Sequence, residues 1–283
     1  MVVDSHHHFW DPSRRDYPWM GEELAPIRRP FGPADLAPLL ATEGVDRTVL
    51  VQTISSLDET REFLATAAGA DFVAGVIGWV DLTEPSVGDV LAELRDGAGG
   101  KFLAGIRHQV HDEPDPRWLL RADVRRGIEA VGDQGLVYDL LVKTRELPAA
   151  VELASSLPGQ TFVLDHIAKP RIAAGPRDKD WERAMAPLAG CSNVYCKLSG
   201  MVTEARWTDW TPDDLRPYVS RVLEWFRPER CMFGSDWPVC LMAADYRRVI
   251  AALRDALKDL DPTAINEVFG DNAMRVYRLE GSP

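Results

Sequence analysis

The N-terminal segment DSHHHFW carries three consecutive histidines, His6, His7 and His8, directly after a short apolar run. Side chains alternate along an extended chain, so His6 and His8 point to one side and His7 to the other. Two imidazoles on one face can bind a metal ion or an anionic group of a substrate. An affinity tag would be longer and would not lie between VVDS and a tryptophan. We therefore interpret His6 and His8 as a functional pair, with an exposed polar turn as the alternative.

Polar residues also interrupt two apolar runs in the middle of the chain. Arg107 and His108 close the run LAGIRH and point to opposite faces. A buried guanidinium needs an oxygen partner, so Arg107 is either a clamp for substrate or half of a structural ion pair. Asp139 lies in the run LVYDLLV. We place His108 and Asp139 among the substrate-binding residues, and the alternative for Asp139 is to pair with Arg107 or to cap a helix.

Two later runs end in further candidates for catalysis. His166 closes FVLDHI, where Asp165 could orient its ring, and Lys169 follows as a candidate substrate contact. Asp236 follows the last run, in MFGSDWP. An N-cap role for Asp236 is less favoured, because Asp245 lies nearer to the next helical segment.

The elements that must position these residues alternate regularly along the chain. Eight short apolar or β-branched runs predict strands, at 2–5, 47–53, 72–80, 103–110, 136–142, 161–167, 194–199 and 231–235. Segments with helical spacing lie between many of them, at 59–70, 86–96, 123–134, 145–155, 213–226 and 245–260. No glycine-rich phosphate loop follows the first strand, which argues against a doubly wound sheet. The pattern predicts an α/β fold, a single-domain (β/α)8 TIM barrel over residues 1–283, with catalytic residues at the carboxyl ends of the strands.

Composition narrows the classes of partner. The 283 residues are 46% hydrophobic and 27% charged, which is typical of a globular protein with a large core. With 32 Lys+Arg against 44 Asp+Glu the formal charge is −12, so we expect neither nucleic acid nor a membrane as a partner. Four cysteines without a CxxC pair predict reduced thiols and, in the absence of a secretory or membrane segment, a cytoplasmic protein. We expect the proline-rich segment 17–38 to form a long loop over the barrel mouth, and we leave a homo-oligomer open.

Taken in order, the segments DSHHHFWD, GIRHQV, YDLLV, FVLDHIAKP, CKLSGMVTEA, MFGSDWPVC and FGDNAMRVYRL resemble the amidohydrolase superfamily, in the branch that contains sugar lactonases. The resemblance implies a (β/α)8 barrel and assigns His6, His8, His166 and Asp236 as candidate metal ligands. Strands four and five lack the lysine and histidine that complete a two-metal site in many members. The resemblance therefore implies one divalent ion, zinc first, or catalysis without metal.

The resemblance further implies hydrolysis of a small-molecule sugar lactone, an aldonolactone such as L-fuconolactone or L-rhamnonolactone. Asp236 is then the general base and acid, and Arg107 and His166 act on the carbonyl and the substrate. Trp10 and Trp237 would form apolar walls for the sugar ring. The alternatives are a metal-dependent decarboxylase or hydratase of the same branch, and a barrel that binds a sugar acid or protein without catalysis.

Overall fold

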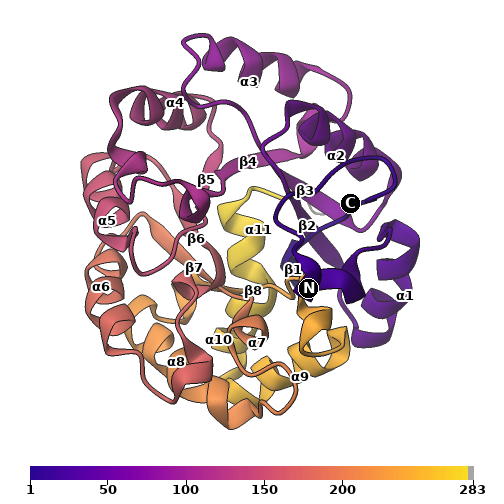
Figure 1. Cartoon of the computed structure of the whole chain (residues 1–283), viewed down its shortest axis with the longest axis vertical. Coiled ribbons are helices and arrows are strands. Elements are labelled where there is room, and N and C mark those ends of the chain that lie inside the picture. Colours follow the sequence, from indigo (N-terminus) through magenta and orange to yellow (C-terminus); the bar gives the residue numbers. More distant parts are fainter. Residues whose placement is uncertain (280–283) are drawn as a thin grey trace.

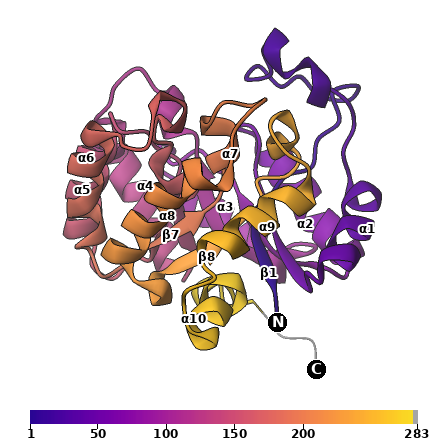
Figure 2. The ribbon, with the colours of Figure 1, turned by 90° about the horizontal axis from the view of Figure 1, so that it is seen from below.

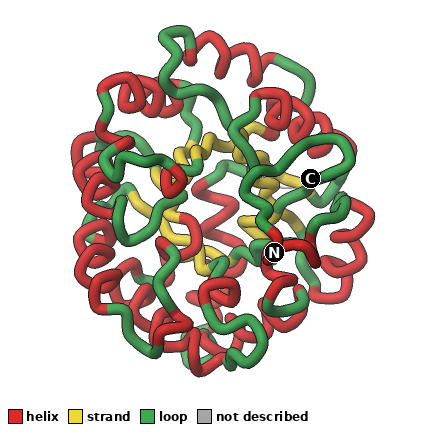
Figure 3. The backbone as a smooth tube through the Cα atoms, in the orientation of Figure 1, coloured by secondary structure: helices red, strands yellow, loops and turns green. Residues whose placement is uncertain are grey.

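Eight parallel strands form one sheet in the order of the chain, and the sheet curls into a barrel (Figures 1 and 3). The computed structural model describes residues 1–279. The strands are β1 Val3–His7, β2 Arg47–Val51, β3 Val73–Gly78, β4 Leu103–His108, β5 Val137–Leu140, β6 Phe162–Leu164, β7 Val194–Leu198 and β8 Cys231–Phe233. All eight predicted strands are present, and the predicted fold class is confirmed.

Most of the helices surround the strands, whereas α11 (Asn272–Val276) lies in the middle of the ring of strands in this view (Figure 1). The helices are α1 Pro33–Glu43, α2 Leu57–Gly69, α3 Val87–Asp96, α4 Ala122–Asp133, α5 Leu147–Ser156, α6 Lys179–Ala189, α7 Met201–Glu204, α8 Pro212–Phe226, α9 Tyr246–Ala256, α10 Pro262–Asn266 and α11 Asn272–Val276, with a π-helical turn at Glu267–Asp271. The six predicted helical segments correspond to α2, α3, α4, α5, α8 and α9. None of the helices in residues 1–279 is long and apolar enough to cross a bilayer.

Helices α1 and α6 are not among the predicted helical segments. Within the segment predicted as a loop, α1 begins at Pro33, which suits the first turn of a helix because proline has no N–H to leave unpaired. Helix α6 begins at Lys179, and the Asp178 side chain accepts a hydrogen bond from Trp181 N. The rest of the 17–38 segment rises above the end of the barrel that carries α7, opposite the N-terminus and α10 (Figure 2).

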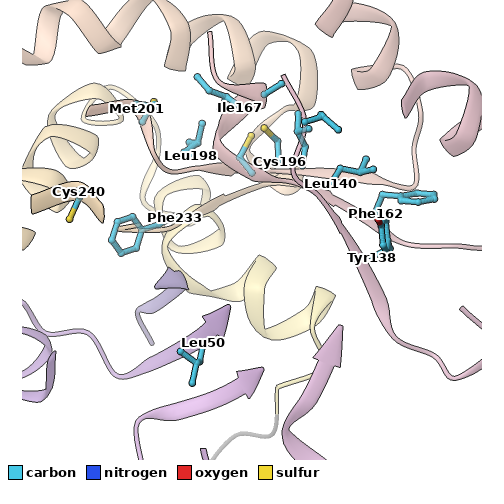
Figure 4. Packing of buried hydrophobic residues seen from close by; sticks show 14 of the residues in the cluster. Leu50, Tyr138, Leu140, Phe162, Ile167, Cys196, Leu198, Met201, Phe233 and Cys240 are labelled. Carbon is cyan, nitrogen blue, oxygen red and sulfur yellow. The ribbon is translucent and has the colours of Figure 1, made fainter. Parts of the chain in front are cut away.

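The barrel interior is built in layers. Aliphatic residues such as Val49, Val137, Val163 and Met232 fill the lower part, and α11 closes it from below with Ala273, Val276 and Tyr277. A second, larger core joins the outer faces of the strands to the helices (Figure 4). Because each strand alternates inward and outward side chains, the next inward positions are Arg107 on β4, Asp139 on β5, Asp165 directly after β6 and Lys197 on β7. A charged layer therefore separates the aliphatic layer from the barrel mouth.

Candidate active site

The seam that closes the barrel runs between β1 and the end of β8. Asp236 N donates to the carbonyl oxygen of His6 over 2.8 Å, and His8 N donates to that of Trp237 over 2.7 Å. The pairing of β1 with β2 is irregular between Asp4 and His7. The seam thus places residues from the two ends of the chain beside each other at the mouth.

Three imidazoles and one carboxylate converge at this seam. His6 Nε2 lies 3.2 Å from His8 Nε2, and Asp236 Oδ1 lies 3.3 Å from His8 Nε2 and 3.8 Å from His6 Nε2. His166 Nε2 completes the group at 3.9 Å from the same carboxylate oxygen. All four side chains are buried. The structure therefore brings together the four residues that the sequence predicted as metal ligands.

Hydrogen bonds orient each imidazole from its far side. His8 Nδ1–H donates to the carbonyl of Val51 over 2.8 Å, which leaves its Nε2 with a free lone pair. His166 Nδ1 lies 2.9 Å from Ser199 Oγ. His6 Nδ1 faces both Asp165 Oδ1 and Lys197 Nζ, each at 3.2 Å. The prediction that Asp165 orients His166 is thus wrong: the Asp165 carboxylate, directly after β6, faces His6, while His166 Nδ1 contacts Ser199.

The turn after β6 has an unusual backbone. His166, Ile167, Ala168 and Lys169 have φ values of 53°, 48°, 59° and 50°, all in the left-handed region that L residues seldom adopt. Such conformations persist where the surrounding structure imposes them, and they concentrate at functional sites. Gly200 supports the turn, because a Cβ there would lie 2.5 Å from His166 Nδ1.

His7 points away from the site, as the alternation predicted. Its Nε2 lies 2.8 Å from Thr48 Oγ1, and its ring packs edge-on against Phe9. Burial lowers the pKa of His7 to about 3, so the ring is neutral at physiological pH. Its role is to anchor β1 to β2.

The charged layer lies directly beneath the imidazoles. Arg107 Nη1 lies 2.8 Å from Asp165 Oδ2, and Lys197 Nζ lies 2.9 Å from Asp165 Oδ1 and 2.6 Å from Asp139 Oδ2. The hydroxyl of Tyr277 also donates to Asp139. Burial raises the pKa of Asp165, but Lys197, His6 and Arg107 more than reverse this and hold it well below its usual range. Burial raises the pKa of Asp139 to about 6 despite the neighbouring Lys197.

A cavity of about 520 Å³ opens above this layer. Five predicted site residues line it, namely His8, Arg107, His166, Lys169 and Asp236. Arg107 forms the structural ion pair that was one of its two alternatives, and it also reaches the cavity. These contacts are consistent with the assigned roles in catalysis and binding, which remain predictions.

Four residues predicted to bind substrate do not line this cavity. Asp139 is held in the charged layer by Lys197, so the alternative of a structural ion pair describes it better, with a lysine in place of Arg107. His108 points out of the barrel, where it stacks on Trp118 and lies 2.7 Å from Glu113 Oε1.

Neither Trp10 nor Trp237, which were predicted to form apolar walls for the sugar ring, lines the cavity. Trp10 donates its indole N–H to the carbonyl of Ile27, and Trp237 packs edge-on against Phe9 and Phe31. The tryptophan that does line the cavity is Trp19, which Trp10 supports edge-on at a ring separation of 5.4 Å.

The lining also contains residues that were not predicted as catalytic, substrate-binding or metal-ligating. They are Trp19, Thr53, Gln109, His111 and Asp112. Gln109 and His111 continue the alternation that begins at Arg107, so a signal for them was present in GIRHQVH. Thr53 likewise follows the inward-facing Val49 and Val51 at two-residue spacing. Burial and the nearby cations lower the pKa of His111 to about 3.

The electrostatics keep Asp236 ionised. Burial raises the pKa of Asp236. The charges of His166, His8 and Lys169 and a hydrogen bond from His8 lower it, and together they bring the pKa below its usual value. Lys169 is itself held by Glu204, 2.9 Å away on α7. An ionised carboxylate at the cavity floor can accept a proton or coordinate a cation.

The donor set fits one divalent metal ion. The side-chain nitrogens of His6 and His166 and a carboxylate oxygen of Asp236 all lie within 4.8 Å of one another. Tetrahedral zinc with bonds of about 2.0–2.2 Å separates its ligand atoms by about 3.4 Å, close to the distances found here. If Asp165 accepts the proton of His6 Nδ1, the Nε2 atoms of His6 and His8 both present lone pairs at 3.2 Å. Two lone pairs at this distance repel each other, so the arrangement is favourable only when a cation or a proton donor lies between or beside the two nitrogens.

The fold is a (β/α)8 barrel, and the donor set at its mouth is of the kind found in metal-dependent hydrolases. Residues 3–279 match the sequence model of the amidohydrolase family, and the chain belongs to that family.

Two relatives match this chain over nearly the whole length of both proteins. The chain is 41% identical to an L-fucono-1,5-lactonase of Burkholderia ambifaria and 38% identical to one of Burkholderia multivorans, over 98% of this chain and 96% of each relative. A crystal structure of a Burkholderia multivorans amidohydrolase with bound Zn has a TM-score of 0.92 at 35% identity, covering 99% of this chain and 100% of that chain.

Proposed function

We propose that the protein hydrolyses the cyclic ester of a sugar acid, an aldonolactone such as L-fuconolactone or L-rhamnonolactone, to the open-chain aldonate. The carrying observation is the position of the Asp236 carboxylate at the cavity floor, between His8 and His166 in a cavity that Arg107 also lines. The likeness to two L-fucono-1,5-lactonases supports the choice of substrate.

Asp236 accepts a proton as the water oxygen attacks the lactone carbonyl carbon. Arg107 offers positive charge at the carbonyl oxygen, where negative charge develops in the tetrahedral intermediate. The ring C–O bond then breaks, and Asp236 returns the proton to the leaving alkoxide. The products are an alcohol and a carboxylic acid, which ionises to the carboxylate and releases a proton to solvent. A zinc ion held by His6, His8, His166 and Asp236 would lower the pKa of a bound water to about 7.

The charges of the cavity favour a neutral substrate. Its two fixed cations, Arg107 and Lys169, already have the carboxylate partners Asp165 and Glu204. A decarboxylase or hydratase that takes carboxylated substrates needs additional cations to bind them. The remaining polar side chains, including Gln109 and Asp112, suit hydroxyl groups.

The test is a panel of aldonolactones with five- and six-membered rings, followed by proton release with a pH indicator. Each rate is corrected for spontaneous ring opening with heat-inactivated protein. The panel is run on chelator-treated protein and on the same protein with added zinc, and carboxylated aromatics are included for decarboxylation. We expect hydrolysis of at least one aldonolactone; a panel without any hydrolysis under either condition would refute the proposal.

A further inference from the structure

Arg107 contacts the nitrogen that a metal would use on His6. Its Nη1 lies 3.3 Å from His6 Nε2, the atom that faces His8 and Asp236. His6 Nδ1 lies 3.2 Å from both Asp165 Oδ1 and Lys197 Nζ. In the tautomer that can bind a metal through Nε2, the Nδ1 proton is directed to Asp165, and the neutral imidazole has one lone pair, at Nε2. That lone pair can accept a hydrogen bond from Arg107 or coordinate a metal ion, but it cannot do both.

The guanidinium has enough other anchors to stay in place if this contact is lost. Nη1 also donates to Asp165 over 2.8 Å, and Nη2 donates to the backbone carbonyl and the side chain of Gln52. Arg107 is almost fully buried and carries a fixed positive charge. A second cation on His6 would therefore lie close to this charge in a poorly screened environment, where repulsion is strong.

From these contacts we propose that Arg107 is a built-in competitor of the divalent metal. In the metal-free protein it donates to His6 Nε2 and, together with Lys197 at His6 Nδ1, places positive charge beside the facing His6 and His8 nitrogens. When a metal ion takes that lone pair, Arg107 gives up its bond to His6 and keeps those to Asp165 and Gln52. Arg107 thereby weakens metal binding and keeps the site ordered without metal. This inference concerns metal binding and does not depend on the lactonase proposal.

The first experiment measures zinc affinity by competition with a chromophoric chelator. Arg107→Gln removes the charge, and Asp165 remains paired with Lys197. Arg107→Lys keeps the charge and serves as the matched control. We expect Arg107→Gln to bind zinc roughly tenfold tighter or more than wild type, and Arg107→Lys to stay within about threefold. His8→Ala, which removes a ligand, should lose most of the binding and so locate the ion.

Equal or weaker binding by Arg107→Gln would overturn the proposal, and so would an equal gain in both Arg107 variants. A second measurement uses the wild-type chain and does not depend on how the variants fold. Crystal structures without metal and after zinc soaking should show the Nη1 to Nε2 distance increasing beyond hydrogen-bonding range, with the bond to Asp165 retained. Zinc on His6 with this distance unchanged would equally overturn the proposal.

Discussion

Asp236 is bonded to His6 through the main chain, with its N–H donating to the His6 carbonyl over 2.8 Å across the seam of the barrel. The carboxylate and the imidazole are therefore positioned by the same contact that closes the fold. A change confined to the Asp236 side chain can remove chemistry without loosening the seam.

Asp236→Asn should abolish most of the turnover and leave the fold intact. The amide cannot accept the proton of water, and loss of a general base costs about 100- to 10,000-fold in rate. Asp236 has a φ of 58°, a conformation that asparagine also tolerates. Lactone hydrolysis and thermal unfolding of the two proteins provide the measurement.

The matched control for that substitution is Asp245→Asn. Asp245 caps α9 by accepting from Arg248 N, and asparagine caps equally well, so activity and stability should both stay unchanged. An Asp236→Asn variant with most of its rate would disprove the base assignment.

Gly200→Ala should reduce activity by displacing His166. The new Cβ would lie 2.5 Å from His166 Nδ1, and a misplacement of about 1 Å can cost roughly 100-fold in rate. Gly44→Ala is the control, since Gly44 has a φ of 67° against 62° for Gly200 and no atom within 4 Å of an added Cβ. Both variants should lose roughly 1–2 kcal/mol of stability from the left-handed backbone. Steady-state rates and urea unfolding separate the two effects, and equal activity in both variants would contradict the role of Gly200.

Lys197→Met should be strongly destabilising, because it leaves Asp139 and Asp165 buried without the ammonium that joins them. Breaking a buried pair by removing one partner costs about 3–5 kcal/mol. Asp139→Asn in the same chain should recover part of that loss, since it removes one of the two buried carboxylates that lost their ammonium partner. A double-mutant cycle in urea measures the coupling, and additive effects would show that the two groups do not interact.

Asp178 should give the loop after β6 a pH-dependent contribution to stability. Hydrogen bonds from Arg171 hold the pKa of Asp178 below its ordinary value of 3.8. A folded-state pKa below the unfolded value adds stability that is complete above about pH 4 and lost as pH falls through the folded pKa. Wild type should therefore exceed Asp178→Asn in unfolding free energy at pH 7, and the difference should shrink in acid. A difference that does not change with pH would contradict this.

The strand pattern and the identity of the four converging residues were accessible from the sequence. Apolar runs at regular intervals locate the eight strands, and period-two alternation separates His6 and His8 from His7. Parallel strands bring their carboxyl ends to one edge, so His166 and Asp236 could be placed beside the histidines without coordinates. Helix α1 was missed because the prolines of the 17–38 segment suggest loop, although Pro33 occupies the first turn.

The partners of the buried charges were decided by the tertiary structure. Local sequence cannot tell whether Arg107, Asp139, Asp165 and Lys197 meet substrate or one another, because that depends on the height of each residue in the closed barrel. The same holds for aromatic residues: Trp10, Trp237 and Trp19 look alike in sequence, and the path of the loop after β1 brings Trp19 to the cavity. Side-chain chemistry and alternation are local properties that a sequence displays, whereas distances across a barrel arise from register and closure of the whole sheet.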